Sequence, residues 1–264
     1  MKLVFNVGLM AGLLAASLTV AGAARADSFE LNYEAPGVET STATFSAVGV
    51  ETFDTLKTGM NASFTAAFGA TGITGTYSGP NGVQINSADQ YGGAGGTGKY
   101  AVAFNSDPYT LTLNQNVNYF GYWLSALDAG NVVTFYANGV QVGQVSPGQV
   151  TAVTQLNKAY YGNPNANFKG QDSGESFAFI NFYDTTGSFN QIQFSEAPTF
   201  GGGYESDNQT VGVFTKESAA SAVVEAPLPL LGSSPIAVLV LAGAFLAAQR
   251  RSANPTMKWA SVAA

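Results

Sequence analysis

The segment 118–143, NYFGYWLSALDAGNVVTFYANGVQVG, carries the strongest fold signal in the chain. Three short runs rich in aromatic and β-branched residues follow one another along this segment and just beyond its ends, at 117–124, 131–137 and 140–145. Asn138-Gly139 separates the last two runs, and this dipeptide favours a tight hairpin turn with positive φ. The segment therefore predicts consecutive antiparallel strands.

Similar alternating runs recur between turn signals along the middle of the chain, as in a β-sandwich. Asn81-Gly82 is a second, weaker turn signal, and only residues 148–162 could form a short helix. We predict the all-β class, with residues 27–215 forming a single jelly-roll-like β-sandwich without cysteine. The other expected strands are 29–33, 51–56, 62–68, 82–86, 100–104, 109–113, 176–183, 189–196 and 210–214.

The N-terminus has the layout of a signal peptide over residues 1–26. Lys2 precedes an apolar run, and Ala24 and Ala26 supply the small residues that signal peptidase requires around its cut. The expected mature chain begins at Asp27 and is exported. The alternative is an uncleaved membrane anchor.

The C-terminus carries a second apolar run. From Leu228 to Ala248 the run is about 21 residues long, close to the ~20 needed to cross a bilayer. Arg250 and Arg251 follow it, which predicts a transmembrane helix with the main body translocated and a short cytoplasmic tail at 252–264. Residues 216–226 form the expected linker, and a buried core helix is the alternative reading of the run.

The tail, residues 227–251, resembles the tripartite PEP-CTERM sorting signal of bacteria. Its short proline motif is Pro227-Leu228-Pro229, which departs from the familiar Pro-Glu-Pro, and the apolar helix and Arg250-Arg251 complete the pattern. The resemblance implies an exosortase-like protease as partner, with an inner-membrane anchor that is transient or permanent and a final place at the cell surface or outside the cell.

The body resembles a family of exosortase-dependent surface proteins over roughly residues 45–214. The stretches that carry this resemblance are DQYGGAGGTGKYAVAF, the opening segment, FAFINFYD and YESDNQTVGVF. The resemblance implies a jelly-roll fold and a non-enzymatic role at the cell surface or in exopolysaccharide.

Charge and composition exclude several classes of function. Residues 27–225 hold all 17 acidic residues but only five lysines, a balance of 5 − 17 = −12. Such a surface repels nucleic acid. The chain has neither histidine nor cysteine, which removes Ser-His-Asp and Cys-His catalysis and most zinc sites.

The glycine-rich stretch 92–99 nearly matches a phosphate loop. Gly93, four residues, Gly98 and Lys99 fit the pattern, but Tyr100 stands where Ser or Thr would bind magnesium. A strand-like run follows the loop instead of a helix, so we expect no nucleotide binding.

One set of oxygen donors could hold calcium. Glu205, Asp207 and Asn208 lie within four residues of one another, and Glu51 and Asp54 are the expected partners from an early strand. The alternative is an ordinary acidic turn. Calcium is the single cofactor that the sequence suggests.

Aromatic side chains offer contacts for a sugar. Tyr122 and Trp123 lie on opposite faces of their strand, so one of them could belong to an aromatic platform. Tyr160, Tyr161 and Phe168 lie in a loop rich in Asn and Gly, where they could contact exopolysaccharide or pack as a lid.

The alternative function is a secreted carbohydrate-active enzyme using paired carboxylates, for which Asp172 and Glu175 are one candidate pair. Such an enzyme should have a deep cleft with two carboxylates facing each other. A matrix protein should have scattered acids and a flat aromatic patch. The sequence favours the non-enzymatic surface protein.

Overall fold

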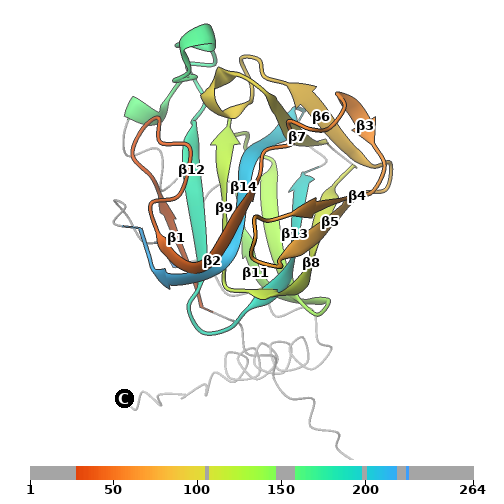
Figure 1. Cartoon of the computed structure of the whole chain (residues 1–264). Coiled ribbons are helices and arrows are strands. Elements are labelled where there is room, and N and C mark those ends of the chain that lie inside the picture. The colour runs from red at the N-terminus through yellow and green to blue at the C-terminus, as the bar shows by residue number, and fades with distance from the viewer. Residues whose placement is uncertain (1–27, 105–106, 147–157, 198–200, 219–223, 226–264) are drawn as a thin grey trace, which may run out of the picture.

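The computed structural model describes residues 28–104, 107–146, 158–197, 201–218 and 224–225, and these form two antiparallel sheets packed into a sandwich (Figure 1). The large sheet has the order β15-β1-β12-β9-β14-β7-β6-β3, with β2 also paired to β14. The small sheet has the order β11-β10-β13-β8-β5-β4. The predicted all-β class is confirmed.

The strands of the large sheet are β1 (Phe29–Tyr33), β2 (Thr44–Glu51), β3 (Gly59–Asn61), β6 (Val83–Ser87), β7 (Lys99–Phe104), β9 (Tyr119–Ser125), β12 (Ala178–Asp184), β14 (Gly203–Lys216) and β15 (Val224–Glu225). Those of the small sheet are β4 (Phe64–Ala67), β5 (Thr74–Ser78), β8 (Tyr109–Val117), β10 (Asn131–Ala137), β11 (Val140–Val145) and β13 (Phe189–Glu196). Three single-turn 3-10 helices complete the described elements: η1 (Ala94–Gly96), η2 (Lys158–Tyr160) and η3 (Ala166–Phe168).

Strand β9 shows how alternation sets the core. Phe120, Tyr122 and Leu124 point between the sheets and join the main core. Trp123 points the other way, yet it is also fully buried, in a small second cluster that includes Phe179. Every residue of β9 is buried, so loops must cover the outer face of the large sheet.

The hairpin predicted at Asn138-Gly139 is confirmed. Asn138 has φ 51° and Gly139 has φ 81°, and the turn joins the paired strands β10 and β11. Asn81-Gly82 is different, because the strands that it joins, β5 and β6, belong to different sheets.

The strand expected over 51–56 is wrong. Strand β2 lies earlier in the chain and ends at Glu51. The Glu51 carboxylate then accepts a hydrogen bond from the Phe53 backbone N–H at 2.6 Å, and Phe53 has φ 58°, so the chain turns there. Of the expected helix at 148–162, residues 148–157 lie outside the described part, and 158–160 form η2.

The predictions for the two ends of the chain fall on residues outside the described part. They include Ala24 and Ala26, Pro227-Leu228-Pro229, and Arg250-Arg251. Within the described residues, no helix has the length and apolar character needed to span a bilayer.

Candidate functional site

The outer face of the large sheet holds the candidate site. On β14, Glu205 lies opposite Val102 of β7 and Ser125 of β9, while Asp207 lies opposite Trp123. Directly paired residues of antiparallel strands point to the same face. The carboxyl groups of Glu205 and Asp207 therefore lie on the side of the sheet away from the main core.

Two loops form a roof over this face. The glycine-rich loop is anchored to the sheet where the Ala94 N–H donates to Asp207 Oδ2 at 2.7 Å. The loop before β12 is tied to it by Asn163 Nδ2, which donates to the Gln90 carbonyl at 3.0 Å, and by Asn165 Nδ2, which donates to the Gly93 carbonyl at 3.2 Å. The glycine-rich loop thus serves as a structural cover.

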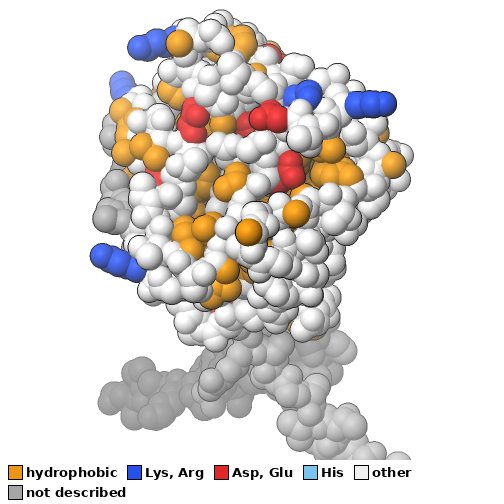
Figure 2. Space-filling view, in the orientation of Figure 1, with side chains coloured by type: hydrophobic (Ala, Val, Ile, Leu, Met, Phe, Trp, Pro, Cys, Tyr) orange, Lys and Arg blue, Asp and Glu red, His pale blue; other side chains and the backbone are white. Residues whose placement is uncertain are grey.

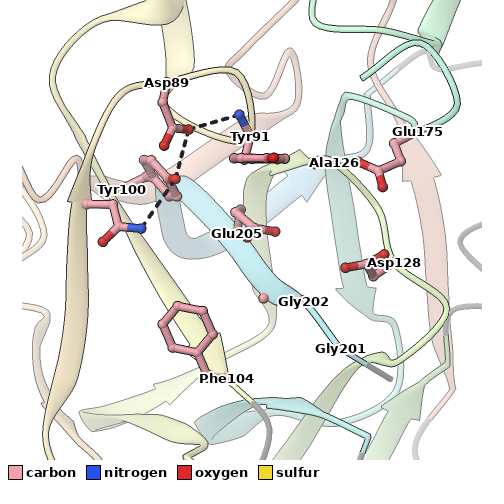
Figure 3. Close-up of a pocket in the computed structure, with 12 residues that line it drawn as sticks. Asp89, Tyr91, Tyr100, Phe104, Ala126, Asp128, Glu175, Gly201, Gly202 and Glu205 are labelled. Atoms are coloured by element: carbon pink, nitrogen blue, oxygen red, sulfur yellow. Dashed lines mark hydrogen bonds between the residues drawn. The ribbon is translucent and has the colours of Figure 1, made fainter. Parts of the chain in front are cut away.

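Beside this roof lies a cavity with a volume of about 640 Å³ (Figure 3). This size is within the range of small-molecule sites in proteins. Its lining comes from β6, β7 and the loop between them, from the segments after β9 and before β12, and from the start of β14: Asn86, Asp89, Tyr91, Tyr100, Phe104, Ala126, Asp128, Glu175, Gly201, Gly202, Gly203 and Glu205.

Carboxylates dominate the polar part of the lining. Glu205 comes from β14, Asp128 from the β9–β10 connection, and Glu175 from the loop before β12, and their side chains point toward a common space (Figure 3). A Cβ atom at Gly202, where φ is 140°, would clash with the Asp128 carboxylate. Glycine at this position lets that carboxylate lie directly against the backbone just before β14.

Burial and mutual repulsion perturb these groups. Burial, followed by the charges of Asp128, Glu175 and Glu196, raises the pKa of Glu205 well above its usual range. Burial also raises the pKa of Asp128 and of Glu175, and the charge of Asp128 adds to the effect at Glu175. Carboxyl groups that share a site in this way do not all ionise together.

Aromatic side chains form the other part of the lining. Tyr91 is 46% exposed and Phe104 is 40% exposed, so both rings are accessible to a ligand. Tyr100 is buried, and its hydroxyl donates to Asp89 Oδ1 at 3.0 Å, so this carboxylate is held in place. The cavity therefore combines accessible rings with fixed acceptors.

Two buried polar atoms on the same face have no hydrogen-bond partner within the described part of the chain: Ser125 Oγ and Trp123 Nε1. Ser125 is 1% exposed and lies directly opposite Glu205. A buried donor without a partner costs about 1–3 kcal/mol. Such atoms are explained where water or a ligand supplies the missing bond.

The structure corrects three of the predicted sugar contacts. Tyr122 and Trp123 are both fully buried, Tyr122 in the main core and Trp123 beneath the roof, so neither can stack on a sugar at the surface. Tyr160 is also buried, and its hydroxyl donates to the Glu34 carbonyl. Tyr161 and Phe168 are half-buried and stay candidates.

The predicted calcium donors are spread over separate contacts. Asp54 accepts from the Lys99 N–H at 2.9 Å, Asp207 accepts from the Ala94 N–H, and Asn208 donates to the Glu39 carbonyl. Glu51 caps the turn at Phe53, and Glu205 lines the cavity. No three acidic side chains among the described residues lie close enough to hold a metal ion, and calcium binding stays a prediction.

In the cavity, Glu175 lies with Asp128 and Glu205 and not with Asp172, the partner suggested by the sequence. Asp172 adopts φ 49° in the loop and does not line the cavity, whereas Asp128 and Glu205 do. Sequence reasoning missed Asp89, Asp128, Tyr91 and Phe104. A signal did exist for Asp128, which stands in the turn-like segment between two strongly predicted strands.

Acidic side chains also gather on the face of the molecule shown in Figure 2, near the end of the large sheet where the glycine-rich loop lies; one basic side chain lies beside them and the others lie toward the edges. Within this region, burial and then the charges of Asp54 and Glu39 raise the pKa of Asp207 to about 7. The N–H donors of Ala94 and Asn208 favour the ionised form but do not outweigh burial.

This raised pKa predicts that stability falls as pH rises. The folded protein holds the Asp207 proton up to about pH 7, whereas an ordinary aspartate loses it near 3.8, so folding is favoured at low pH and the advantage disappears across this window. At about 1.4 kcal/mol per pKa unit, the Asp207 contribution is roughly 4 kcal/mol. Urea unfolding should give a lower free energy of unfolding at pH 8 than at pH 5, and Asp207→Asn should reduce the difference, leaving the part that Glu205 and Glu196 contribute. Equal stability at the two pH values would contradict this assignment.

No family model, curated protein or solved structure matches the chain.

Proposed function

We propose that the chain is an exported, non-enzymatic cell-surface or extracellular-matrix protein whose sandwich binds exopolysaccharide in the cavity of the large sheet. The observation that carries the proposal is the composition of this cavity, in which the exposed rings of Tyr91 and Phe104 lie among the carboxylates of Asp89, Asp128 and Glu205. It sits in a fold that we propose to be a jelly-roll.

The lining matches the chemistry of a sugar. Aromatic faces pack against the apolar C–H patches of pyranose rings, while carboxylates and amides bind the hydroxyl groups at the ring edge. The Tyr100 hydroxyl and the backbone N–H groups of Tyr91 and Gly92 all donate to Asp89 Oδ1, which fixes the orientation of this carboxylate before any ligand arrives. Such preorganisation lowers the entropic cost of binding.

The strand order supports the jelly-roll. Strands β8, β9 and β10 alternate between the two sheets, as do β12, β13 and β14. In the large sheet β9 lies between β12 and β14, and in the small sheet β13 lies between β10 and β8. The two series are thus wrapped around each other, as in jelly-roll sandwiches.

A glycan array tests the binding proposal. The full chain, purified from the medium or membranes of an expressing bacterium, should bind at least one bacterial exopolysaccharide. Phe104→Ala should weaken binding about tenfold, the effect of losing one ring contact of ~1.4 kcal/mol. Val140→Ala, which changes an exposed residue on the small sheet, is the matched control and should bind as the parent does. Absence of any glycan signal would refute the proposal.

The intact mass tests the sorting proposal. If signal peptidase and an exosortase-like protease process the chain, the protein released at the surface begins at Asp27 and ends near residues 226–231. Material that keeps Arg250, Arg251 and the last thirteen residues would instead be permanently anchored, contrary to the proposed sorting signal.

A second candidate function is a secreted carbohydrate-active enzyme, and one observation favours it. Glu205 is buried with a raised pKa, as a general acid needs, and the carboxylates of Asp128 and Glu175 face the same space. The enzyme should release reducing ends from the glycan that the array identifies, and Glu205→Gln should abolish release while binding persists. If the parent releases none, the non-enzymatic proposal is kept.

A further inference from the structure

The charge of the cavity indicates the chemistry of its ligand. Four of its lining residues are acidic, namely Asp89, Asp128, Glu175 and Glu205, and none of the described lining residues is Lys or Arg. A neutral glycan gains hydrogen bonds from such a lining but does nothing to relieve the repulsion that keeps these carboxyl groups from ionising together. A ligand that carries positive charge would compensate them.

The aromatic rings suit the same kind of ligand. Phe104 and Tyr91 expose their rings beside the carboxylates. A cation close to an aromatic face is attracted by the ring quadrupole, and the attraction grows when solvent is excluded. The cavity therefore offers both contacts that bind ammonium groups in proteins.

One buried group lines the cavity and a second lies next to it on the neighbouring strand. Glu205 is 8% exposed, and among the described residues only its own backbone N–H hydrogen-bonds its carboxylate. Ser125 Oγ, on the same face and directly opposite Glu205, has no partner among those residues either. A buried acceptor with spare capacity beside an unpaired hydroxyl suits a ligand that carries several N–H and O–H donors.

We propose that the cavity selects a polysaccharide of amino sugars with free amino groups, in which ammonium groups along the chain bind the carboxylates of Asp128, Glu175 and Glu205 and a sugar ring packs on Phe104. This inference rests on the proposed function and specifies its ligand class. An amino-sugar ligand would use all three features of the site: the carboxylates, the exposed aromatic rings and the buried polar groups.

Three tetrasaccharides with the same β-1,4 backbone test the inference, because they differ chiefly at C2. They are the tetramers of glucosamine, of N-acetylglucosamine and of glucose. By calorimetry with the full chain, at a pH just below neutral and physiological salt, the glucosamine tetramer should bind at least about tenfold more tightly than the other two. Asp128→Asn/Glu175→Gln should remove this preference.

A charge-matched variant excludes general attraction to an acidic protein. Glu30→Gln/Glu217→Gln also removes two carboxylates, but neither residue lines the cavity, so its preference for glucosamine should equal that of the parent. Spermidine, which supplies ammonium groups without a ring, should bind more weakly than the glucosamine tetramer. Equally tight spermidine binding would overturn the amino-sugar assignment.

The outcomes separate this inference from the proposed function. Equal affinity for the three tetramers, or binding only to a neutral glycan on the array, would overturn the amino-sugar inference and leave glycan binding in place. Loss of the preference in both double variants would also overturn it, since the effect would then be one of overall charge. Failure to bind any glycan would refute the proposed function itself.

Discussion

Gln209→Ala is expected to lower the free energy of unfolding by about 3–5 kcal/mol, because it removes a polar bridge between the sheets and leaves a cavity. Gln209 is fully buried. It accepts a hydrogen bond from the Tyr77 hydroxyl of the small sheet at 2.9 Å, and its Nε2 donates to the Tyr109 hydroxyl at 2.8 Å and to Ser206 Oγ at 3.0 Å. Its removal leaves Tyr77 without its acceptor.

Gln209→Leu separates the two causes. Leucine fills most of the volume, and Tyr109 and Ser206 keep their mutual bond of 2.7 Å, so the remaining cost is that of the unpaired Tyr77 hydroxyl, about 1–3 kcal/mol. Urea unfolding followed by the fluorescence of buried Trp123 would measure both variants. A leucine variant as stable as the parent would show that the bridge contributes nothing to stability.

Phe135→Ala is expected to lower the free energy of unfolding by about 3–5 kcal/mol, because it opens a cavity in the main core. Phe135 is fully buried, and its ring lies 4.9 Å from both Phe29 and Phe189 and 5.2 Å from Phe182, centroid to centroid. These contacts join β10 and β13 of the small sheet to β1 and β12 of the large one. No rearrangement of one side chain can fill the space.

Phe104→Ala is the matched control, since it truncates the same side chain at the accessible cavity. Phe104 is 40% exposed, so the variant should stay within about 0.5 kcal/mol of the parent in urea unfolding. Its loss of glycan binding would then reflect the site and not the fold. A control variant as unstable as Phe135→Ala would mean that Phe104 is structural and would remove the aromatic part of the site.

Alternation and turn chemistry account for what the sequence could predict of the fold. The inward residues of β9 follow from the pleat, and the β10–β11 hairpin follows from the positive φ that Asn138-Gly139 tolerates. The strand expected at 51–56 was wrong because a local hydrogen bond, from Phe53 to the Glu51 side chain, turns the chain. Such competition between side chain and strand leaves no periodic signal.

The site was less predictable, because distant loops build it. The sequence marks Glu205 as a calcium donor and pairs Glu175 with Asp172, whereas the structure places both in one cavity. Asp128 and Asp89, which also line it, lie in no motif. Alternation could not show which face of β9 is accessible, since a roof of loops buries Trp123 as completely as the core buries Tyr122. The cavity depends on how crossovers between sheets place these loops.

The most direct test of the central claim is a crystal structure of the protein with the oligosaccharide that it binds most tightly on the array. The account predicts sugar density in the cavity, with one ring against Phe104 and polar substituents within hydrogen-bond distance of Glu205 and Asp128. Density at any other place on the sandwich, with the cavity empty at saturating ligand, would contradict it.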